Sequence, residues 1–138
     1  MKALSGGRIF VASLQEAEDL VRPEAMGAYA RHGIAGVLTV AHDVRARCVS
    51  TLPHLSLPIE ETVPTHPGWF ELACRFAGII QNPLLVHCHA GVNRSRVFAA
   101  AILHRVWYID LDAAIRDADP PQGRCLDSMI AWARTPLA

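Results

Sequence analysis

The chain has 138 residues, of which 51% are hydrophobic and 19% are charged, and its 13 basic and 13 acidic residues cancel. This composition excludes a disordered chain, and the sequence has no run of 18 or more apolar residues that could span a membrane. A net charge of zero provides no basic surface, so we expect neither a nucleic acid nor a membrane as partner. We expect one domain, residues 1–138, with a hydrophobic core of its own.

Strands and helices alternate along the predicted chain. Strands are predicted near residues 8–12, 34–40, 54–57 and 84–88, and helices near residues 14–31, 67–81, 94–107, 111–117 and 124–134. Such an order indicates a single α/β domain with a central, mostly parallel sheet of four to five strands, flanked by helices on both faces. Ligands of such sheets bind at the carboxyl ends of the strands.

The most informative segment runs from His87 to Ser95, where Cys88 and Arg94 are separated by five residues. A loop of this length can direct successive backbone N–H groups at one tetrahedral anion, and a helix that begins at its end adds its own N–H groups. These groups and Arg94 favour the thiolate form of Cys88, which is the nucleophilic form. Arg94 also offers a planar fork for two phosphoryl oxygens, and Gly91 permits a tight turn.

The residues on either side of this loop agree with that interpretation. Pro83–Val86 is a short apolar run, typical of a buried parallel strand. Val97–Leu103 is a helix-forming run that is apolar on most sides, so we expect a buried helix there. The alternative is a chance arrangement of a core cysteine and a surface arginine, which the combined residue pattern makes improbable.

The loop resembles the signature of the cysteine-dependent protein tyrosine phosphatase superfamily, which has His-Cys, five residues, and Arg-Ser or Arg-Thr. The rest of the chain is similar to the compact dual-specificity phosphatase-like branch. The matching segments are Arg8–Ser13 with the helix from Leu14 to Tyr29, the strand Gly33–Val40, and Leu57–Glu61.

The resemblance implies a phosphomonoester hydrolase that acts on phosphotyrosine, phosphoserine and phosphothreonine through a phosphocysteine, without a metal or other cofactor. The catalytic residues would be Cys88, Arg94, Glu61 and Ser95, with His87 supporting the loop from behind. The substrate-binding residues would be His89, Ala90, Gly91, Val92 and Asn93. Four cysteines without paired spacing favour reduced thiols, so we expect the protein in the cytoplasm. We also expect a monomer whose partner is a phosphorylated protein or a small phosphomonoester.

The proton donor departs from the family pattern, which places an Asp where this chain has Glu60 and Glu61. Matching the segment Leu57–Glu61 to the family pattern places the proton donor at Glu61, whereas counting the residues forward to Trp69 places it at Glu60. Both carboxylates could instead be ordinary solvated loop residues. Asp43 and Asp119 are weaker alternatives.

Three alternative functions and one modification stay open. The chain could be a phosphate-binding pseudophosphatase module with little turnover, a phosphatase of a non-protein substrate (an RNA 5′-end or a phosphoinositide), or a rhodanese-like sulfur carrier. Cys125 occupies roughly the position of a family Asn that supports the loop. Under oxidation, Cys48 or Cys125 could form a protective disulfide with Cys88, although buried core cysteines are the simpler expectation.

Overall fold

The computed structural model describes residues 1–20, 31–43, 52–80, 83–90 and 93–135. In chain order its elements are β1 (Lys2–Leu4), a 3-10 turn (Ser5–Gly7), β2 (Ile9–Ala12), α1 (Leu14–Asp19), β3 (Gly36–Val40), β4 (His54–Leu57), α3 (Pro67–Ile79), β5 (Leu84–His87), α4 (Arg94–Arg105), α5 (Leu111–Ala118) and α6 (Arg124–Arg134). The predicted α/β class is confirmed. β1 was not predicted, and most of the helix predicted at 14–31 beyond α1 lies outside the described residues.

The five strands form one sheet in the order β1-β2-β5-β3-β4. Only β1 runs antiparallel to its neighbour, and the pairs β2–β5, β5–β3 and β3–β4 are parallel. All four residues of β5 are buried, as expected for a strand with neighbours on both sides and helices on both faces. The apolar run that ends at Val86 is therefore the central strand of the fold.

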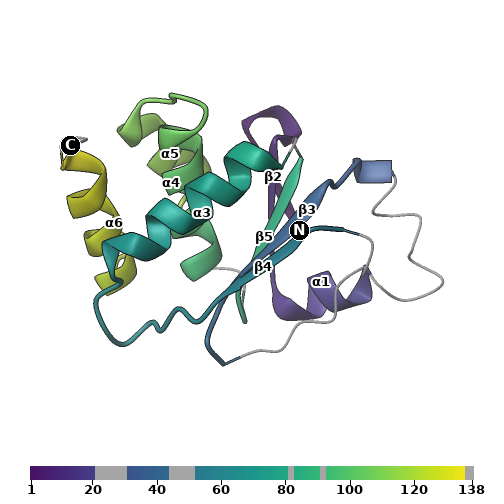
Figure 1. Ribbon diagram of the computed structural model, residues 1–138, viewed down its shortest axis with the longest axis horizontal. Helices are drawn as coiled ribbons and strands as arrows, with labels where there is room; N and C mark the ends of the chain where they lie inside the picture. Colours follow the sequence, from purple (N-terminus) through teal and green to yellow (C-terminus); the bar gives the residue numbers. More distant parts are fainter. Residues whose placement is uncertain (21–30, 44–51, 81–82, 91–92, 136–138) are drawn as a thin grey trace.

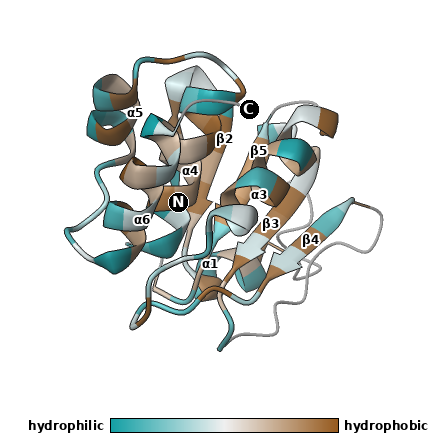
Figure 2. Cartoon of the chain, turned by 60° about the vertical axis from the view of Figure 1, so that its left-hand side comes forward, coloured by the Kyte–Doolittle hydropathy of each residue, from teal (hydrophilic) through white to brown (hydrophobic). Residues whose placement is uncertain are grey.

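Helices cover the two faces of the sheet unequally (Figure 1). One face carries α1 and a small core that includes Ala17, Val37 and Leu85. The other face carries α3, α4, α5 and α6 over a larger core that includes Leu38 and Val86. Figure 2 shows hydrophobic residues concentrated in the strands and in the helix surfaces that face them. Successive residues of one strand therefore serve different cores, because their side chains alternate between the faces.

Helix α4 lies at the centre of the larger core. Every residue of α4 from Val97 to Leu103 is buried, and its alanines allow neighbouring elements to approach closely. Phe98 packs against Phe70 of α3 with tilted rings whose centroids are 4.7 Å apart, and Phe70 in turn contacts Trp132 of α6 at 5.3 Å. Within the described ranges, no helix is both long enough and apolar enough to cross a bilayer.

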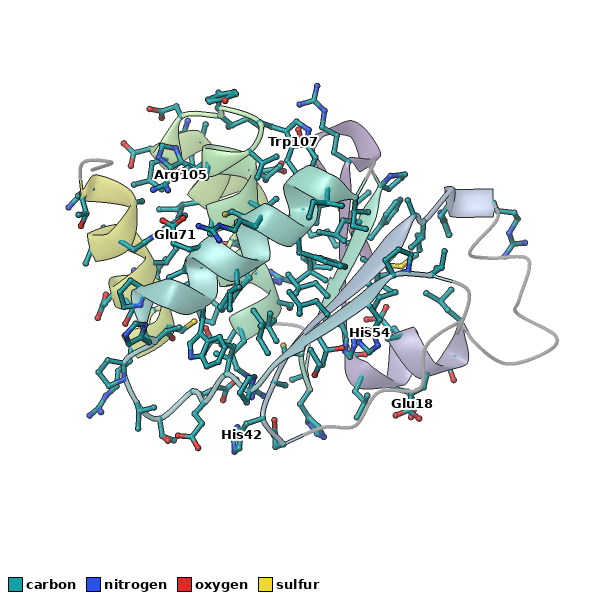
Figure 3. All side chains as sticks on the ribbon, in the orientation of Figure 1. Glu18, His42, His54, Glu71, Arg105 and Trp107 are labelled. Atoms are coloured by element: carbon teal, nitrogen blue, oxygen red, sulfur yellow. The ribbon has the colours of Figure 1, made fainter. Side chains whose placement is uncertain are left out.

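A polar triad fixes α3, α4 and α6 to one another at the edge of this core. The Glu71 Oε1 accepts a 2.8 Å hydrogen bond from the Trp132 indole and a 3.0 Å bond from the Arg105 guanidinium. These two donors hold the pKa of Glu71 below its usual range. Arg105 also lies 4.2 Å from the Trp132 ring centroid, at cation–π distance. Figure 3 shows Glu71 and Arg105 facing one another between the helices.

Candidate active site

The candidate loop connects the central strand β5 to the buried helix α4. It begins at the carboxyl end of β5, the edge at which parallel α/β sheets bind ligands. Cys88 is 1% exposed, whereas His89 and Ala90 are exposed. The carbonyl oxygen of His89 accepts a 2.9 Å hydrogen bond from the backbone N–H of Leu14, which ties the loop to the start of α1. Gly91 and Val92 lie outside the described residues.

The N-terminus of α4 is arranged to receive an anion. Asn93 precedes the helix without capping it through its side chain, and the first turn carries no acidic residue. The N–H groups of that turn and the positive end of the helix dipole therefore favour a negatively charged group. The buried Asn93 Oδ1 has no hydrogen-bond partner among the described residues.

Arg94 is the first residue of α4, and its side chain is 3% exposed. Its Nη1 donates two hydrogen bonds of 2.9 Å, one to the Asp43 carboxylate and one to the carbonyl oxygen of Ile59. The hydrogen bond from Arg94 is the main reason that the pKa of Asp43 lies below its usual range. Within the described chain, the buried Nε of Arg94 has no hydrogen-bond acceptor, and its ion-pair neighbour is the Glu61 carboxylate, which an oxyanion at this nitrogen would replace.

The structure separates the two glutamates that the sequence analysis left as alternatives. The Glu61 Oε1 lies 3.4 Å from the Arg94 Nε, at ion-pair distance. The Glu60 Oε1 instead lies 4.0 Å from the His42 Nε2. Glu61 is therefore the glutamate that lies beside the candidate phosphate-binding arginine.

The other two candidate acids occupy different positions. Asp43 also lies beside Arg94, as described above, and its contact there was not predicted. The available signal was its place just after β3, which ends at the same sheet edge as β5. Asp119 is 80% exposed and pairs with Arg96 at 3.9 Å, away from the Arg94 contacts.

Ser95 lies directly behind the cysteine. Its Oγ is 3.4 Å from the Cys88 Sγ, within hydrogen-bond distance for sulfur, and the side chain is fully buried. A hydroxyl in this position can donate to a thiolate and stabilise it.

The side chain of His87 lies on the same face of the sheet as Leu85, the face that α1 covers, and its ring is fully buried. Its Nε2 is 2.7 Å from the Thr39 Oγ1, and its Nδ1 is 3.3 Å from the carbonyl oxygen of Cys88. Burial lowers the pKa of His87 to about 4, so the ring is neutral near pH 7. The supporting position expected for His87 agrees with this contact, whereas neither Thr39 nor His54, which lies 2.7 Å from the same Thr39 oxygen, was predicted.

Cys74 and Cys125 are buried thiols in the larger core. Burial raises the pKa of Cys125 to about 11 and that of Cys74 to about 12, which makes both poor nucleophiles. Cys48 lies outside the described residues, and Cys125 and Cys88 are both free thiols. A disulfide that forms on oxidation between Cys88 and either Cys48 or Cys125 therefore stays a prediction. In the part of the chain that the structure describes, no three His, Cys, Asp or Glu side chains converge as a metal site requires.

A hollow of about 190 Å³ lies at the segment that carries the two glutamates. All of its lining residues come from positions 58–69: Pro58, Ile59, Glu60, Val63, Pro64, Thr65, His66 and Trp69. Because Ile59 also binds Arg94 through its carbonyl oxygen, the hollow adjoins the backbone that holds the arginine.

Comparison with known proteins identifies the architecture. No protein-family model matches the sequence, and no curated protein matches it either. Among solved structures, human DUSP28 is similar with a TM-score of 0.71 and 18% identity, over 93% of this chain and 90% of that one. The human tyrosine phosphatase-like serine/threonine/tyrosine-interacting protein is similar with a TM-score of 0.69 and 17% identity, over 91% and 90%.

PTPMT1, solved in complex with PI(5)P, also has a TM-score of 0.69 and 17% identity, over 93% of this chain and 91% of its own. These similarities extend over nearly the whole chain but rest on low sequence identity. They concern the path of the backbone. The chain therefore has the fold of the dual-specificity phosphatases.

Proposed function

We propose that this protein is a cysteine-dependent phosphatase of the protein tyrosine phosphatase superfamily, dual-specificity branch, that hydrolyses phosphomonoesters on proteins. One observation supports the proposal above all others. The buried Arg94, whose Nε has no hydrogen-bond acceptor within the described chain, and the buried pair Cys88–Ser95 lie together at the N-terminus of α4. A nucleophile, an anion-binding guanidinium and a helix N-terminus at one point suit transfer of a phosphoryl group.

In the first step, the Cys88 thiolate attacks phosphorus while Arg94 and the loop amides bind the equatorial oxygens. The P–O bond to the leaving group breaks, and Glu61 transfers its proton to the departing oxygen. The products of this step are a free alcohol or phenol and a phosphocysteine. The position of Glu61 beside Arg94 supports this role, since the scissile oxygen must lie near both groups.

In the second step, the Glu61 carboxylate accepts a proton from water, and the water oxygen attacks phosphorus. The P–S bond breaks, which releases inorganic phosphate and regenerates the Cys88 thiolate. Ser95 donates a hydrogen bond to the departing sulfur. The 3.4 Å separation of its Oγ from the Cys88 Sγ supports this role.

The charges around Arg94 favour a substrate with a single phosphate. Asp43, Glu60 and Glu61 gather near one arginine and His42, and the exposed loop positions His89 and Ala90 include no lysine. A substrate with several phosphates would bring further negative charge against these carboxylates, at a cost that a phosphorylated side chain of a protein avoids. This argument supports a phosphoprotein over a phosphoinositide or an RNA 5′-end. We further propose that the enzyme is a monomer in the reducing cytoplasm, where a catalytic thiolate stays reduced.

Turnover of an aryl phosphate by the wild type and by Cys88→Ser tests the proposal. We expect hydrolysis by the wild type, a loss of at least about a thousandfold in Cys88→Ser, and a trapped phosphoenzyme in rapid acid quench. Tight binding of a phosphotyrosine peptide without turnover would instead identify a phosphate-binding module. Sulfur transfer from thiosulfate would identify a sulfur carrier. Preference for a phosphoinositide over phosphopeptides would refute the protein substrate.

The two glutamates provide a matched pair for the proton donor. Glu61→Gln should slow hydrolysis of a substrate with a poor leaving group by about a hundredfold or more, and change a good leaving group little, because only the poor one needs protonation. Glu60→Gln is the control, since Glu60 lies at His42 and not at Arg94. Equal and small effects of Glu61→Gln on both substrates would exclude Glu61 as the acid.

A further inference from the structure

Three side chains from neighbouring strands form a hydrogen-bonded chain that ends at the nucleophile's own backbone. The Thr39 Oγ1 on β3 lies 2.7 Å from the His54 Nε2 on β4 and 2.7 Å from the His87 Nε2 on β5. The His87 Nδ1 then lies 3.3 Å from the carbonyl oxygen of Cys88. Figure 3 shows His54 on the side of the sheet that α1 covers.

The chain begins at solvent and ends in the interior. His54 is an exposed residue, Thr39 is 1% exposed and His87 is fully buried. The parallel pairing of β3 with both β4 and β5 brings the three side chains to one face. Thr39 therefore links the two histidines, because its hydroxyl contacts both of them.

Counting protons leaves one arrangement of donors and acceptors. His87 is neutral because burial lowers its pKa to about 4, so its ring carries one N–H. A carbonyl oxygen can only accept, so this N–H is at Nδ1 and points to Cys88. The Nε2 of His87 is then a lone pair, and the single hydroxyl hydrogen of Thr39 must be donated to it. His54 must in turn donate from its Nε2 to the Thr39 oxygen.

We propose that Thr39 and His54 are positioning residues that fix the tautomer of His87 and, through it, the first peptide of the phosphate-binding loop. The peptide that follows Cys88 is planar and trans, so its C=O and the N–H of His89 point in opposite directions. Holding the carbonyl against His87 fixes the N–H of His89 away from that ring. In the other tautomer, a ring lone pair would face the carbonyl oxygen, and the peptide would lose its restraint.

Protonation of His54 leaves the proposed hydrogen-bonded chain intact, whereas protonation of His87 breaks it. A proton added to His54 at Nδ1 leaves its Nε2 hydrogen in place, so donation to Thr39 continues. A proton added to His87 at Nε2 meets the hydrogen of the Thr39 hydroxyl, which must then rotate and break its own donated bond. The positioning effect therefore depends on the hydroxyl of residue 39 and on a donor at residue 54.

Four variants test these two requirements. Thr39→Val keeps the shape of the side chain and removes the hydroxyl, whereas Thr39→Ser keeps the hydroxyl. His54→Leu removes the donor, whereas His54→Gln keeps an N–H. Ser56→Ala is the control, because Ser56 pairs with Thr39 in the sheet register and is exposed. Melting temperatures establish that each variant is folded before it is compared.

The first measurement is the pair of nitrogen chemical shifts of the His87 ring by NMR. We expect an Nδ1–H tautomer in the wild type, Thr39→Ser, His54→Gln and Ser56→Ala, and a mixture of tautomers in Thr39→Val. An Nε2–H tautomer in the wild type, or an unchanged tautomer in Thr39→Val, overturns the proposal. If Thr39→Val does not fold, a mixture in His54→Leu supports the proposal and an unchanged tautomer overturns it.

The second measurement is the rate of Cys88 alkylation by iodoacetamide, together with kcat and KM on an aryl phosphate. We expect Thr39→Val to lower kcat/KM roughly tenfold and to change the pH profile of alkylation, with Thr39→Ser within about twofold of the wild type. This inference rests on the proposed phosphatase function only for the kinetic readout. A wild type without turnover but with the expected tautomers would refute the proposed function and support the positioning chain.

Discussion

Acidification is expected to destabilise the fold through His87, because its neutral ring is built into the buried face of the sheet. Burial lowers the pKa of His87 from its ordinary value of 6.5 to about 4 in the folded protein. The unfolded chain therefore binds a proton more readily than the folded chain between these two values. Stability is complete above about pH 6.5 and falls as the pH drops toward 4.

The magnitude follows from the two pKa values. A pKa difference of one between the folded and unfolded states corresponds to about 1.4 kcal/mol in the free energy of unfolding. A difference of about 2.5 therefore limits the loss of stability to about 3.4 kcal/mol, reached once both states are protonated. Between about pH 7.5 and pH 5, the part of this limit that is lost is about 2 kcal/mol.

Urea unfolding at both pH values, for the wild type and His87→Gln, measures this loss. His87→Gln lowers the free energy of unfolding at both pH values, but its pH dependence should be weaker by about 2 kcal/mol. His32→Gln is the control and should retain the full pH dependence, since the side chain of His32 is exposed and packs against the ring of Phe10. The carboxyls of Asp43 and Glu71, whose pKa values are lowered, contribute equally in all three proteins. Equal pH dependence in the wild type and His87→Gln would refute the reasoning.

Three further substitutions test other contacts. Asp43→Ala releases one hydrogen bond of the Arg94 Nη1 and should lower kcat/KM on an aryl phosphate about tenfold, and an unchanged value would contradict its orienting role. Phe98→Ala leaves a cavity in the larger core and should cost about 3–5 kcal/mol in urea unfolding, whereas a loss below about 1 kcal/mol would mean that the core closes around it. Ser13→Ala removes the capping box of α1 and should cost about 1 kcal/mol, measured in the same way, with no loss counting against the cap.

The sequence predicts the order of elements well where local patterns are strong. The continuous apolar runs that became β5 and α4 have strong signals because both elements are buried on nearly all sides. β1 has only three residues, two of them exposed, and forms by pairing with β2 at the edge of the sheet. Its formation depends on a partner strand, so no pattern within residues 2–4 indicates it.

The contacts of the site likewise differ in how far the sequence predicts them, because some are local and others depend on strand pairing. The spacing of Cys88, Arg94 and Ser95 lies within one loop and helix start, so sequence alone brings them together. The contact of Asp43 with Arg94 joins residues 51 positions apart, and it depends on two strands ending at the same edge. Thr39 and His54 reach His87 only through the register of three parallel strands, which no motif specifies.

The burial of α4 has a consequence for the anions that the proposed phosphate-binding site can accept. Because residues 97–103 are enclosed by the sheet and by α3, α5 and α6, the first turn of α4 cannot shift to follow a larger anion. We therefore expect a small tetrahedral oxyanion to bind better at this end of α4 than a bulky phosphate mimic. We expect selectivity over related folds to come from groups that extend toward the hollow at residues 58–69, whose lining includes Glu60, Val63 and Trp69.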